Sequence, residues 1–253
     1  MSLPTPPPLP NSRTEADGSA VIRVLGYNVR SLRDDEDALV RVIRACAPDL
    51  VFVQEAPRFF RWRKHAARLA AKTDLVVLSG GATAAGPLLL CSLRAFVERT
   101  EDILLPLTPG EHRRGFATAV VRIGGVRLGV LSAHLSLRAA ERYEQAGMLL
   151  ERLAAMDAPY VVAAGDINER PEGPAFRRLA GELQDCWTAA PWGGELTSEH
   201  VPGGQRIDAV FASRGVEVLG CGVPRGLAGV SDADLSAATD HYPVLAALRL
   251  PAR

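Results

Sequence analysis

Acidic, amide and imidazole side chains gather at the ends of apolar segments in this sequence. Gly165-Asp166-Ile167-Asn168 follows the apolar run 160–164, and Thr239-Asp240-His241 precedes the run 242–250. Short apolar runs bounded by polar residues are typical of buried strands. Because ligand sites form where the strands of a sheet end, we expect these polar groups to share one site.

Eight polar residues beside such runs make up the candidate site. They are Asn28, Glu55, His134, Asp166, Asn168, Asp208, Asp240 and His241. Asn28 ends the first predicted strand and Glu55 ends the second, so an amide oxygen and a carboxylate would lie at neighbouring strand ends. These ligands suit Mg²⁺ or Mn²⁺, which keep several waters and take one or two carboxylates from the protein. Zinc is disfavoured, because the sequence has no cluster of His or Cys to hold it.

The other residues of the set predict water activation and charge stabilisation. Asp166 and Asn168 are two residues apart after a strand, so both side chains return to one face, where one can orient a water and the other can hold a phosphoryl oxygen. Asp208 can brace the imidazole of His241, which leaves His134 to donate to a charged oxygen. Enzymes accelerate the slow hydrolysis of phosphate monoesters by up to about 10²¹-fold, which requires metal, activated water and charge stabilisation together. The residues therefore predict hydrolysis of a phosphate ester.

Each of these residues also has an ordinary structural interpretation. Asp166 and Asn168 could form a turn or a helix N-cap, and Asp208 could pair with the nearby Arg206. The two histidines could be hydrogen-bonded members of the core. We favour catalysis because all of these residues occur together at predicted strand ends.

The hydrophobic pattern predicts the elements that position the site. Strands are expected at 21–27, 50–54, 75–78, 88–93, 96–105, 116–123, 126–135, 160–164, 207–212, 216–221 and 244–250. Helices are expected at 35–46, 58–72, 138–156 and 174–179, and Asp232 and Asp234 are expected in a loop. Two strand-rich halves with helices between their strands predict a four-layer α/β/β/α sandwich, in which two packed mixed sheets are flanked by helices.

Composition indicates one globular domain. A chain of 253 residues with 47% hydrophobic content can bury one large core, which we place at 21–253. Residues 1–20 contain five prolines by Pro10, so we expect a disordered tail outside the fold. The chain has 29 basic and 29 acidic residues and hence no net charge, so nucleic-acid binding would need a local basic patch.

The segment 58–72 is the one candidate for such a patch, because it alternates basic and aromatic residues. It could bind a phosphate backbone. Alternatively, Phe59, Trp62, Ala66 and Leu69 form the buried stripe of a helix whose charges are solvated. We favour the second interpretation.

The four cysteines have no metal spacing and are expected to be reduced core thiols. The sequence has neither an apolar stretch of about 20 residues nor the layout of a signal peptide. We therefore expect a cytoplasmic protein without a transmembrane segment, although secretion stays open if a leader has been removed. No obligate protein partner is evident.

Six segments in order resemble the motifs of the endonuclease/exonuclease/phosphatase superfamily. They are Gly26-Tyr27-Asn28-Val29-Arg30, Pro48-Asp49-Leu50-Val51-Phe52-Val53-Gln54-Glu55, Ser132-Ala133-His134-Leu135, Gly165-Asp166-Ile167-Asn168, Arg206-Ile207-Asp208-Ala209-Val210-Phe211 and Thr239-Asp240-His241-Tyr242-Pro243-Val244. The resemblance extends from about Val21 to Leu250. It implies a deoxyribonuclease I-like fold and phosphoesterase activity that depends on Mg²⁺ or Mn²⁺.

The resemblance also implies roles for the site residues. Glu55 would bind the metal with help from Asn28, Asp166 would activate or orient water, and Asn168 would contact the phosphate. His134 would stabilise the phosphate, and His241, paired with Asp208, would act in acid–base catalysis or in stabilising the transition state. Asp240 would position His241 or join the metal ligands. We also assign Arg114 to substrate binding.

Three features bear on the substrate. His134 stands where the abasic-site endonucleases of the superfamily usually have tyrosine, which favours the deoxyribonuclease, sphingomyelinase and phosphatase-like branches. The Gly-Asn element of many relatives is absent from 80–87, and Ser198 follows Thr197 where relatives often have an aromatic residue. Both departures lie in segments that would contact the substrate and determine specificity.

The leading functional prediction is a phosphoesterase that acts on a phosphodiester or phosphomonoester of a small molecule, a lipid head group or a nucleic acid. A DNA endonuclease or exonuclease of the same superfamily is the alternative within the enzyme class. A non-catalytic module that binds phosphate or nucleic acid is the alternative outside it.

Overall fold

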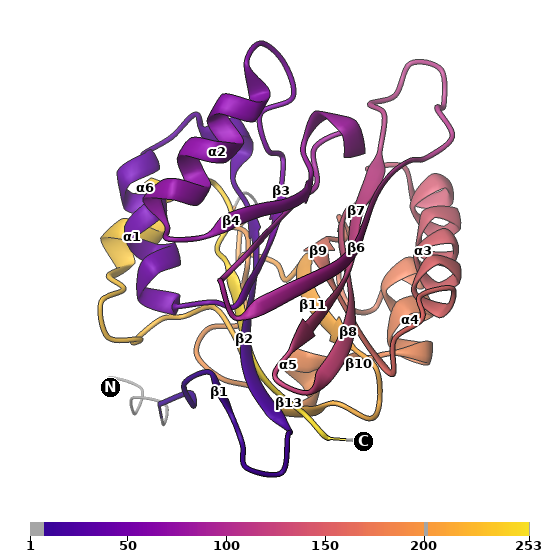
Figure 1. Ribbon diagram of the computed structural model, residues 1–253. Coiled ribbons are helices and arrows are strands. Elements are labelled where there is room, and N and C mark those ends of the chain that lie inside the picture. Colours follow the sequence, from indigo (N-terminus) through magenta and orange to yellow (C-terminus); the bar gives the residue numbers. More distant parts are fainter. Residues whose placement is uncertain (1–7, 200–201, 253) are drawn as a thin grey trace.

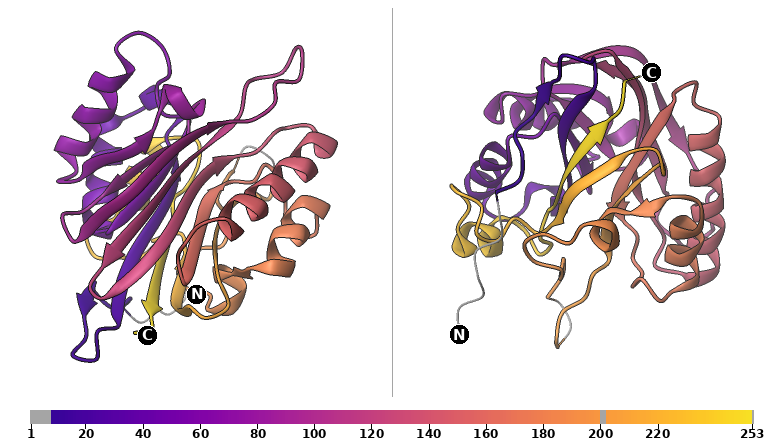
Figure 2. Two further views of the ribbon diagram at one scale, coloured as in Figure 1. Left: turned by 45° about the vertical axis from the view of Figure 1, so that its right-hand side comes forward. Right: turned by 90° about the horizontal axis from the view of Figure 1, so that it is seen from below.

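Two β-sheets pack face to face in the computed structural model, which describes residues 8–199 and 202–252 (Figure 1). Helices cover the outer face of each sheet, as the turned views show (Figure 2). The arrangement confirms the predicted four-layer α/β/β/α sandwich of two mixed sheets.

The first sheet is assembled from both ends of the chain. Its strands run in the order β12 (Glu217–Gly222), β13 (Val244–Leu250), β2 (Ala20–Asn28), β3 (Leu50–Gln54), β5 (Leu88–Cys91) and β4 (Val76–Gly80), and β1 (Arg13–Thr14) also pairs with β2. The helices on its outer face are α1 (Glu36–Cys46), α2 (Trp62–Lys72) and α6 (Asp232–Ala238).

The second sheet comes from the middle of the chain. Its order is β10 (Gln184–Asp185), β11 (Asp208–Ala212), β9 (Tyr160–Asp166), β8 (Val126–His134), β7 (Gly115–Ile123) and β6 (Ala95–Leu104). Its outer face is covered by α3 (Ala139–Ala154) and α4 (Pro174–Glu182). The short elements α5 (Cys186–Ala189), η1 (Arg30–Leu32) and η2 (Ala82–Ala84) lie in connections.

Burial on both faces explains why the central strands are apolar at most positions. Along β2, Ile22 and Val24 enter the core between the sheets, whereas Leu25 and Tyr27 enter the core under the helices. Successive side chains of a strand point to opposite faces, so a strand covered on both sides needs apolar residues at nearly every position.

Each sheet contains one parallel pair of strands connected by a helix. The pair β2 and β3 is joined through α1, and the pair β8 and β9 is joined through α3. In the second pair, His134 lies opposite Asp166, each at the carboxyl end of its strand. Gly165 allows this close pairing, since a Cβ at that position would lie 1.9 Å from the Ala133 carbonyl oxygen.

Two sequence-based predictions about the helices are corrected. Helix α2 begins at Trp62 instead of residue 58, because Arg61 adopts the left-handed conformation (φ 56°) that ends helical continuity. Asp232 and Asp234 belong to α6, not to a loop. Ser231 caps this helix by accepting a hydrogen bond from the Asp234 N–H.

The prediction of a disordered tail over residues 1–20 is wrong for residues 9–20, and residues 1–7 lie outside the described part of the chain. Leu9 is buried, and β1 pairs with β2. The buried Arg23 guanidinium donates to the carbonyl oxygens of Leu9 (2.8 Å) and Pro10 (3.0 Å). A buried guanidinium needs acceptors, and the backbone of this segment supplies them.

The four cysteines are buried and free, as predicted. Among the described residues, no helix combines the length and the apolar character that crossing a membrane requires.

Candidate active site

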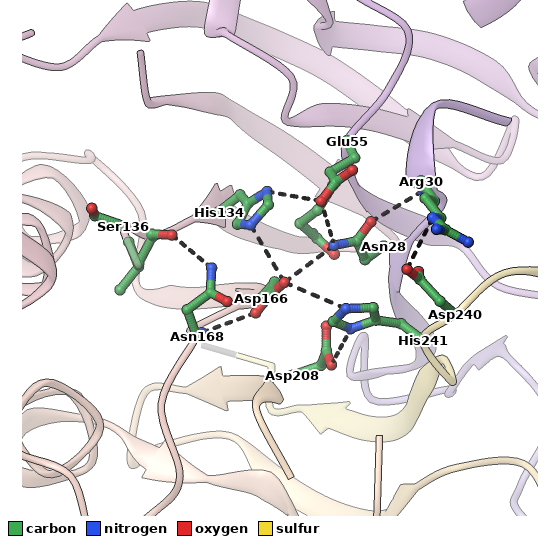
Figure 3. Close-up of polar contacts among 12 residues, drawn as sticks. Asn28, Arg30, Glu55, His134, Ser136, Asp166, Asn168, Asp208, Asp240 and His241 are labelled. Carbon is green, nitrogen blue, oxygen red and sulfur yellow. Dashed lines mark hydrogen bonds and ion pairs between the residues drawn. The ribbon is translucent and has the colours of Figure 1, made fainter. Parts of the chain in front are cut away.

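A cleft of about 600 Å³ lies at the carboxyl ends of the parallel strands, where the two sheets meet. Six of the predicted site residues line it, namely Glu55, Arg114, His134, Asp166, Asn168 and His241. Figure 3 shows how most of these side chains converge from both sheets. The structure thus brings five of the eight strand-end residues to one cleft, together with Arg114, which was assigned to substrate binding.

Asp166 lies at the centre of the site and is 2% exposed. Its Oδ2 atom accepts a hydrogen bond from Asn28 Nδ2 (3.1 Å) and lies 3.4 Å from His134 Nε2 and 3.9 Å from His241 Nε2. Burial, together with the charge of Asp208, raises the pKa of Asp166 to about 7. The group can therefore gain or lose a proton near neutral pH.

His241 and Asp208 form a buried pair next to Asp166. Asp208 lies opposite Asp166 in the antiparallel register of β11 and β9, and its Oδ2 is 2.8 Å from His241 Nδ1. Burial lowers the pKa of His241, but the charge and hydrogen bond of Asp208 outweigh it, aided by Asp166 and Asp240, so the pKa rises to about 10. His241 is therefore an imidazolium at neutral pH, and Nδ1–H donates to Asp208.

The alternative in which Asp208 pairs with Arg206 does not occur. Arg206 Nη1 instead contacts Asp185 Oδ2 at 2.9 Å. Thr197 holds the start of β11 in place, because its Oγ1 accepts the backbone N–H groups of Ile207 and Asp208, both at 3.1 Å. Asp208 is thus directed towards His241.

His134 and His241 differ in charge, although each is 8% exposed. Burial lowers the pKa of His134 well below its usual value, and the positive charges of Arg114 and His241 lower it further. At neutral pH, His134 is a neutral imidazole with one N–H to donate. The pair of histidines therefore supplies one cation and one neutral donor.

Asn28 and Glu55 bring the first sheet into the site. Asn28 Nδ2 donates to Glu55 Oε1 (3.3 Å) as well as to Asp166, while its Oδ1 accepts the Arg30 N–H (3.1 Å). Glu55 has a positive φ of 54°, and its side chain is 40% exposed. A non-glycine residue in this conformation is held there by its surroundings, which is frequent at functional sites.

The donor set at this end of the cleft fits a hard divalent cation. Carboxylate oxygens of Glu55 and Asp166 converge on one amide nitrogen without a cationic side chain between them. Carboxylate oxygens are the ligands that Mg²⁺ and Mn²⁺ prefer. The amide of Asn28 presents its nitrogen to them because its oxygen is taken by Arg30, so the predicted role of Asn28 as a metal ligand stays a prediction.

A second group of possible ligand atoms comes from Asp166, Asp208 and His241, which lie within 4.8 Å of one another. One imidazole nitrogen of this group is already bound to Asp208. We therefore interpret these three residues as a proton-holding network and the Glu55 end as the metal end.

Asn168 and Asp240 occupy opposite sides of the site. Asn168 has φ 55°, its N–H donates to Asp166 Oδ1 (2.9 Å), and its Nδ2 donates to the Leu135 carbonyl (2.8 Å). Asp240 forms an ion pair with Arg30 Nε (3.0 Å; Figure 3). This cation is a partner that the sequence did not indicate, and the place of Asp240 among metal ligands stays a prediction.

Sequence reasoning missed part of the cleft wall. Arg33, Arg58, His112, Phe59 and Phe60 also line the cleft. The favoured buried stripe is wrong at Phe59, which is 82% exposed, although Ala66 and Leu69 are buried as expected. The alternation of basic and aromatic residues in the segment 58–72 was the sequence signal that could have identified this wall.

Another hollow, of about 660 Å³, lies between α3 and the connection from β6 to β7. Its lining includes Leu105, Pro106, Tyr143 and Met148. Three of the residues that line the cleft at the strand ends have strongly shifted pKa values. Clusters of shifted pKa values mark functional sites, so we place the chemistry in that cleft.

Comparison with known proteins identifies the fold and the family pattern. Residues 25–241 match the model of the Endonuclease/Exonuclease/phosphatase family. The structure resembles an endonuclease/exonuclease/phosphatase protein from Bacteroides vulgatus, with a TM-score of 0.74 and 18% identity over 91% of this chain and 99% of that chain. No curated protein matches the chain in sequence.

Two structures of TDP2 are also similar. Truncated TDP2 from Caenorhabditis elegans has a TM-score of 0.69 and 19% identity over 90% of this chain and 97% of that chain. TDP2 from D. rerio, complexed with a single-strand DNA product, has a TM-score of 0.66 and 18% identity over 90% and 98% of the two chains. These similarities confirm the predicted deoxyribonuclease I-like fold.

Proposed function

This chain belongs to the endonuclease/exonuclease/phosphatase family, and we propose on that premise that it hydrolyses a phosphate ester bond with the help of a divalent metal ion. The observation that carries the proposal is the position of the Asp166 carboxylate. It lies within 3.1 to 3.9 Å of an amide and two imidazole rings, where the two sheets meet. The acid Asp166, the cation His241 and the proposed metal ligand Glu55 thus line one cleft.

We infer that Glu55 holds the metal beside the Asp166 carboxylate and that Asn28 orients both carboxylates. Bound Mg²⁺ or Mn²⁺ would neutralise phosphoryl charge and lower the pKa of a coordinated water. The exposed Glu55 carboxylate can hold a cation that keeps part of its hydration shell.

Asp166 is the group we assign to orienting and deprotonating the attacking water. Its pKa of about 7 gives it a substantial carboxylate fraction near neutral pH and a useful affinity for the proton that it removes. The Asn168 N–H keeps Oδ1 fixed, which leaves Oδ2 directed towards the cleft.

The cationic His241 would stabilise the negative charge that develops on the phosphoryl group. Its Nδ1–H donates to Asp208 and its Nε2 lies 3.9 Å from Asp166 Oδ2, so the imidazolium would act on the phosphoryl group through its positive charge. Neutral His134 would donate a hydrogen bond. Asn168, through the other hydrogen of its amide nitrogen, and Arg114, on the cleft wall, would contact the remaining phosphoryl oxygens.

The test is hydrolysis of bis-p-nitrophenyl phosphate and p-nitrophenyl phosphate with Mg²⁺, with Mn²⁺ or with EDTA. We expect turnover that requires the metal and disappears in the double variant Glu55→Gln/Asp166→Asn. The two chromogenic substrates rank diester against monoester activity. Absence of turnover of every phosphate ester, together with retained metal binding, would support the non-catalytic alternative.

A nucleic-acid phosphodiester is the second candidate that a specific observation favours. Three arginines and His112 face the cleft, and the similar TDP2 from D. rerio was crystallised with a single-strand DNA product. Such a patch can attract a phosphate backbone although the chain has no net charge. Plasmid nicking and degradation of end-labelled oligonucleotides test this candidate, and the Glu55→Gln/Asp166→Asn variant serves as the control.

A further inference from the structure

Two adjacent phenylalanines at the rim of the cleft are almost fully exposed. Phe59 is 82% exposed and Phe60 is 80% exposed, and both line the same cleft as the catalytic residues. They lie in the connection between β3 and α2, immediately after the metal-binding Glu55. Neighbouring large apolar side chains on a surface mark a binding site more often than an isolated one does.

The connection is fixed on both sides of the two rings. Arg58 Nη1 donates to the Ala85 carbonyl oxygen at 3.1 Å. The Trp62 ring packs so closely on Gly81 that a Cβ there would lie 2.6 Å from it, and the Trp62 N–H donates to the Phe59 carbonyl oxygen at 3.0 Å. In Figure 1 this connection projects from the end of α2, beyond the edge of its sheet. The backbone is thus anchored while the two rings face solvent.

Cationic groups surround the rings. The Arg58 guanidinium lies 5.9 Å from the centre of the Phe59 ring, and that of Arg61 lies 4.9 Å from the centre of the Phe60 ring. Arg114 and His112 line the wall supplied by the loop before β7. The acidic residues that line the cleft are the two site carboxylates, Glu55 and Asp166. The rim is therefore complementary to an anionic chain that carries flat, unsaturated groups.

We propose that Phe59 and Phe60 form a stacking platform for the bases of single-stranded nucleic acid whose phosphodiester enters the cleft. The proposal rests on the phosphoesterase function proposed above. Aromatic rings beside arginines bind single strands because every base has a face on which it can stack, while the arginines contact phosphates. In a duplex those base faces are covered by neighbouring base pairs, so the platform selects unpaired ends or single strands.

The proposal is tested by measuring binding without turnover. A short 5′-fluorescein-labelled oligothymidylate is titrated with the protein in EDTA, and fluorescence anisotropy gives the Kd. The double variant Phe59→Leu/Phe60→Leu keeps apolar side chains and removes the rings, so we expect it to bind about tenfold more weakly or worse. A duplex of the same length should bind with an affinity that this variant does not change.

Phe96→Leu is the matched control. Phe96 is 68% exposed on β6 and does not line the cleft, so its replacement should leave oligothymidylate binding unchanged. Circular dichroism and thermal unfolding establish that each variant is folded. A wild-type protein that does not bind oligothymidylate, or a Phe59→Leu/Phe60→Leu variant that binds as the wild type does, overturns the proposal.

Two further outcomes are separated by the design. The first outcome is that the wild type sediments with phosphatidylglycerol vesicles, the Phe59→Leu/Phe60→Leu variant does not, and neither protein binds the oligonucleotide. In that case the two rings insert into a lipid surface and the stacking platform is rejected. Hydrolysis of bis-p-nitrophenyl phosphate by the wild type tests the phosphoesterase function alone. Ring-dependent binding without such hydrolysis would reject that function while leaving the stacking contact in place.

Discussion

The two parallel strand pairs have the same topology and bring different chemistry to the cleft. The unit β2–α1–β3 ends in Asn28 and Glu55, and the unit β8–α3–β9 ends in His134 and Asp166. The Glu55 side chain is 40% exposed, whereas that of Asp166 is 2% exposed. The first carboxylate can reach a hydrated cation, while the second is buried among imidazole groups and has a pKa of about 7.

The difference comes from the neighbouring strands, not from the units themselves. On the Asp166 side, antiparallel β11 begins with Asp208 directly opposite Asp166. On the Glu55 side, antiparallel β5 begins with Leu88 opposite Val53 and brings no charge. The shared topology therefore places a carboxylate at each sheet end, and the adjacent strand decides whether that carboxylate is buried beside a second acid.

The largest expected effect comes from removing the buried carboxylate. Asp166→Asn keeps the shape of the side chain and removes its ability to take a proton, so kcat for bis-p-nitrophenyl phosphate should fall by about 10³-fold or more at saturating Mg²⁺. Asp157→Asn is the control, because Asp157 is an acid whose side chain is 95% exposed and which pairs with Arg127 outside the cleft. Near wild-type kcat in the Asp166 variant would exclude the assigned role.

Removing the exposed carboxylate should give a smaller loss of a different kind. We expect Glu55→Gln to raise the apparent Kd for Mg²⁺ by about 10- to 100-fold, so that excess metal restores part of the activity. Titration of turnover against Mg²⁺ measures this, and the same titration should not rescue Asp166→Asn. If both variants respond to metal in the same way, the division into a metal end and a proton-holding end is wrong.

The buried group of Asp166, Asp208 and His241 should also make the free energy of unfolding of the metal-free protein depend on pH. The pKa of His241 is about 10 in the folded protein and 6.5 ordinarily. Because the folded value is the higher one, its contribution to the free energy of unfolding is complete below pH 6.5 and is lost as the pH rises towards 10. The loss is at most about 1.4 kcal/mol per pH unit.

Urea unfolding in EDTA at several pH values between 7 and 10 measures this loss. His241→Gln should flatten the dependence, whereas His65→Gln, on α2 away from the cleft, should leave it as in the wild type. Equal slopes for the wild type and His241→Gln would show that Asp208 does not hold the proton on the imidazole.

Much of this comparison could be read from the sequence. Strands buried on both faces give largely apolar runs, so the ends of β2, β3, β8 and β9 and the polar residues at or just after those ends were identifiable. Helix α1 was equally clear, because its apolar residues recur at helical spacing and Asp35 caps its first turn. Local pattern and burial agree in these elements.

The remaining features depend on contacts between distant segments or on single backbone angles. The ion pair of Arg30 with Asp240 joins segments near the two ends of the chain, and the sequence around either residue does not indicate it. The positive φ of Arg61 interrupts an otherwise helical pattern and turns Phe59 out of the core. Residues 9–20 pack because Arg23 needs acceptors, which a proline-rich composition does not reveal.

The smallest expected effect comes from removing a side-chain contact that joins β8 of one strand–helix–strand unit to β3 of the other. Ser132 Oγ, on β8, donates to the Val53 carbonyl oxygen (3.0 Å) and accepts from Gln54 Nε2 (3.2 Å), both on β3. Ser132→Ala removes both hydrogen bonds, while Gln54 Nε2 keeps the Phe52 carbonyl oxygen as an acceptor (2.9 Å). The loss costs about 0.5–1.5 kcal/mol for each bond and should lower Tm by roughly 2–4 °C per kcal/mol. Since Glu55 follows Gln54 and His134 lies two residues after Ser132, kcat should also fall severalfold.

Ser79→Ala separates the loss of stability from the loss of alignment. Ser79 Oγ, on β4, donates to the Thr118 carbonyl oxygen on β7 (3.1 Å), so it also joins the two sheets, but away from the cleft. Both variants should lose Tm, and only Ser132→Ala should lose kcat, because of these two contacts only that of Ser132 lies next to Glu55 and His134. An equal kcat in the two variants would mean that the site tolerates movement of one sheet against the other, and the two units would then act as independent parts.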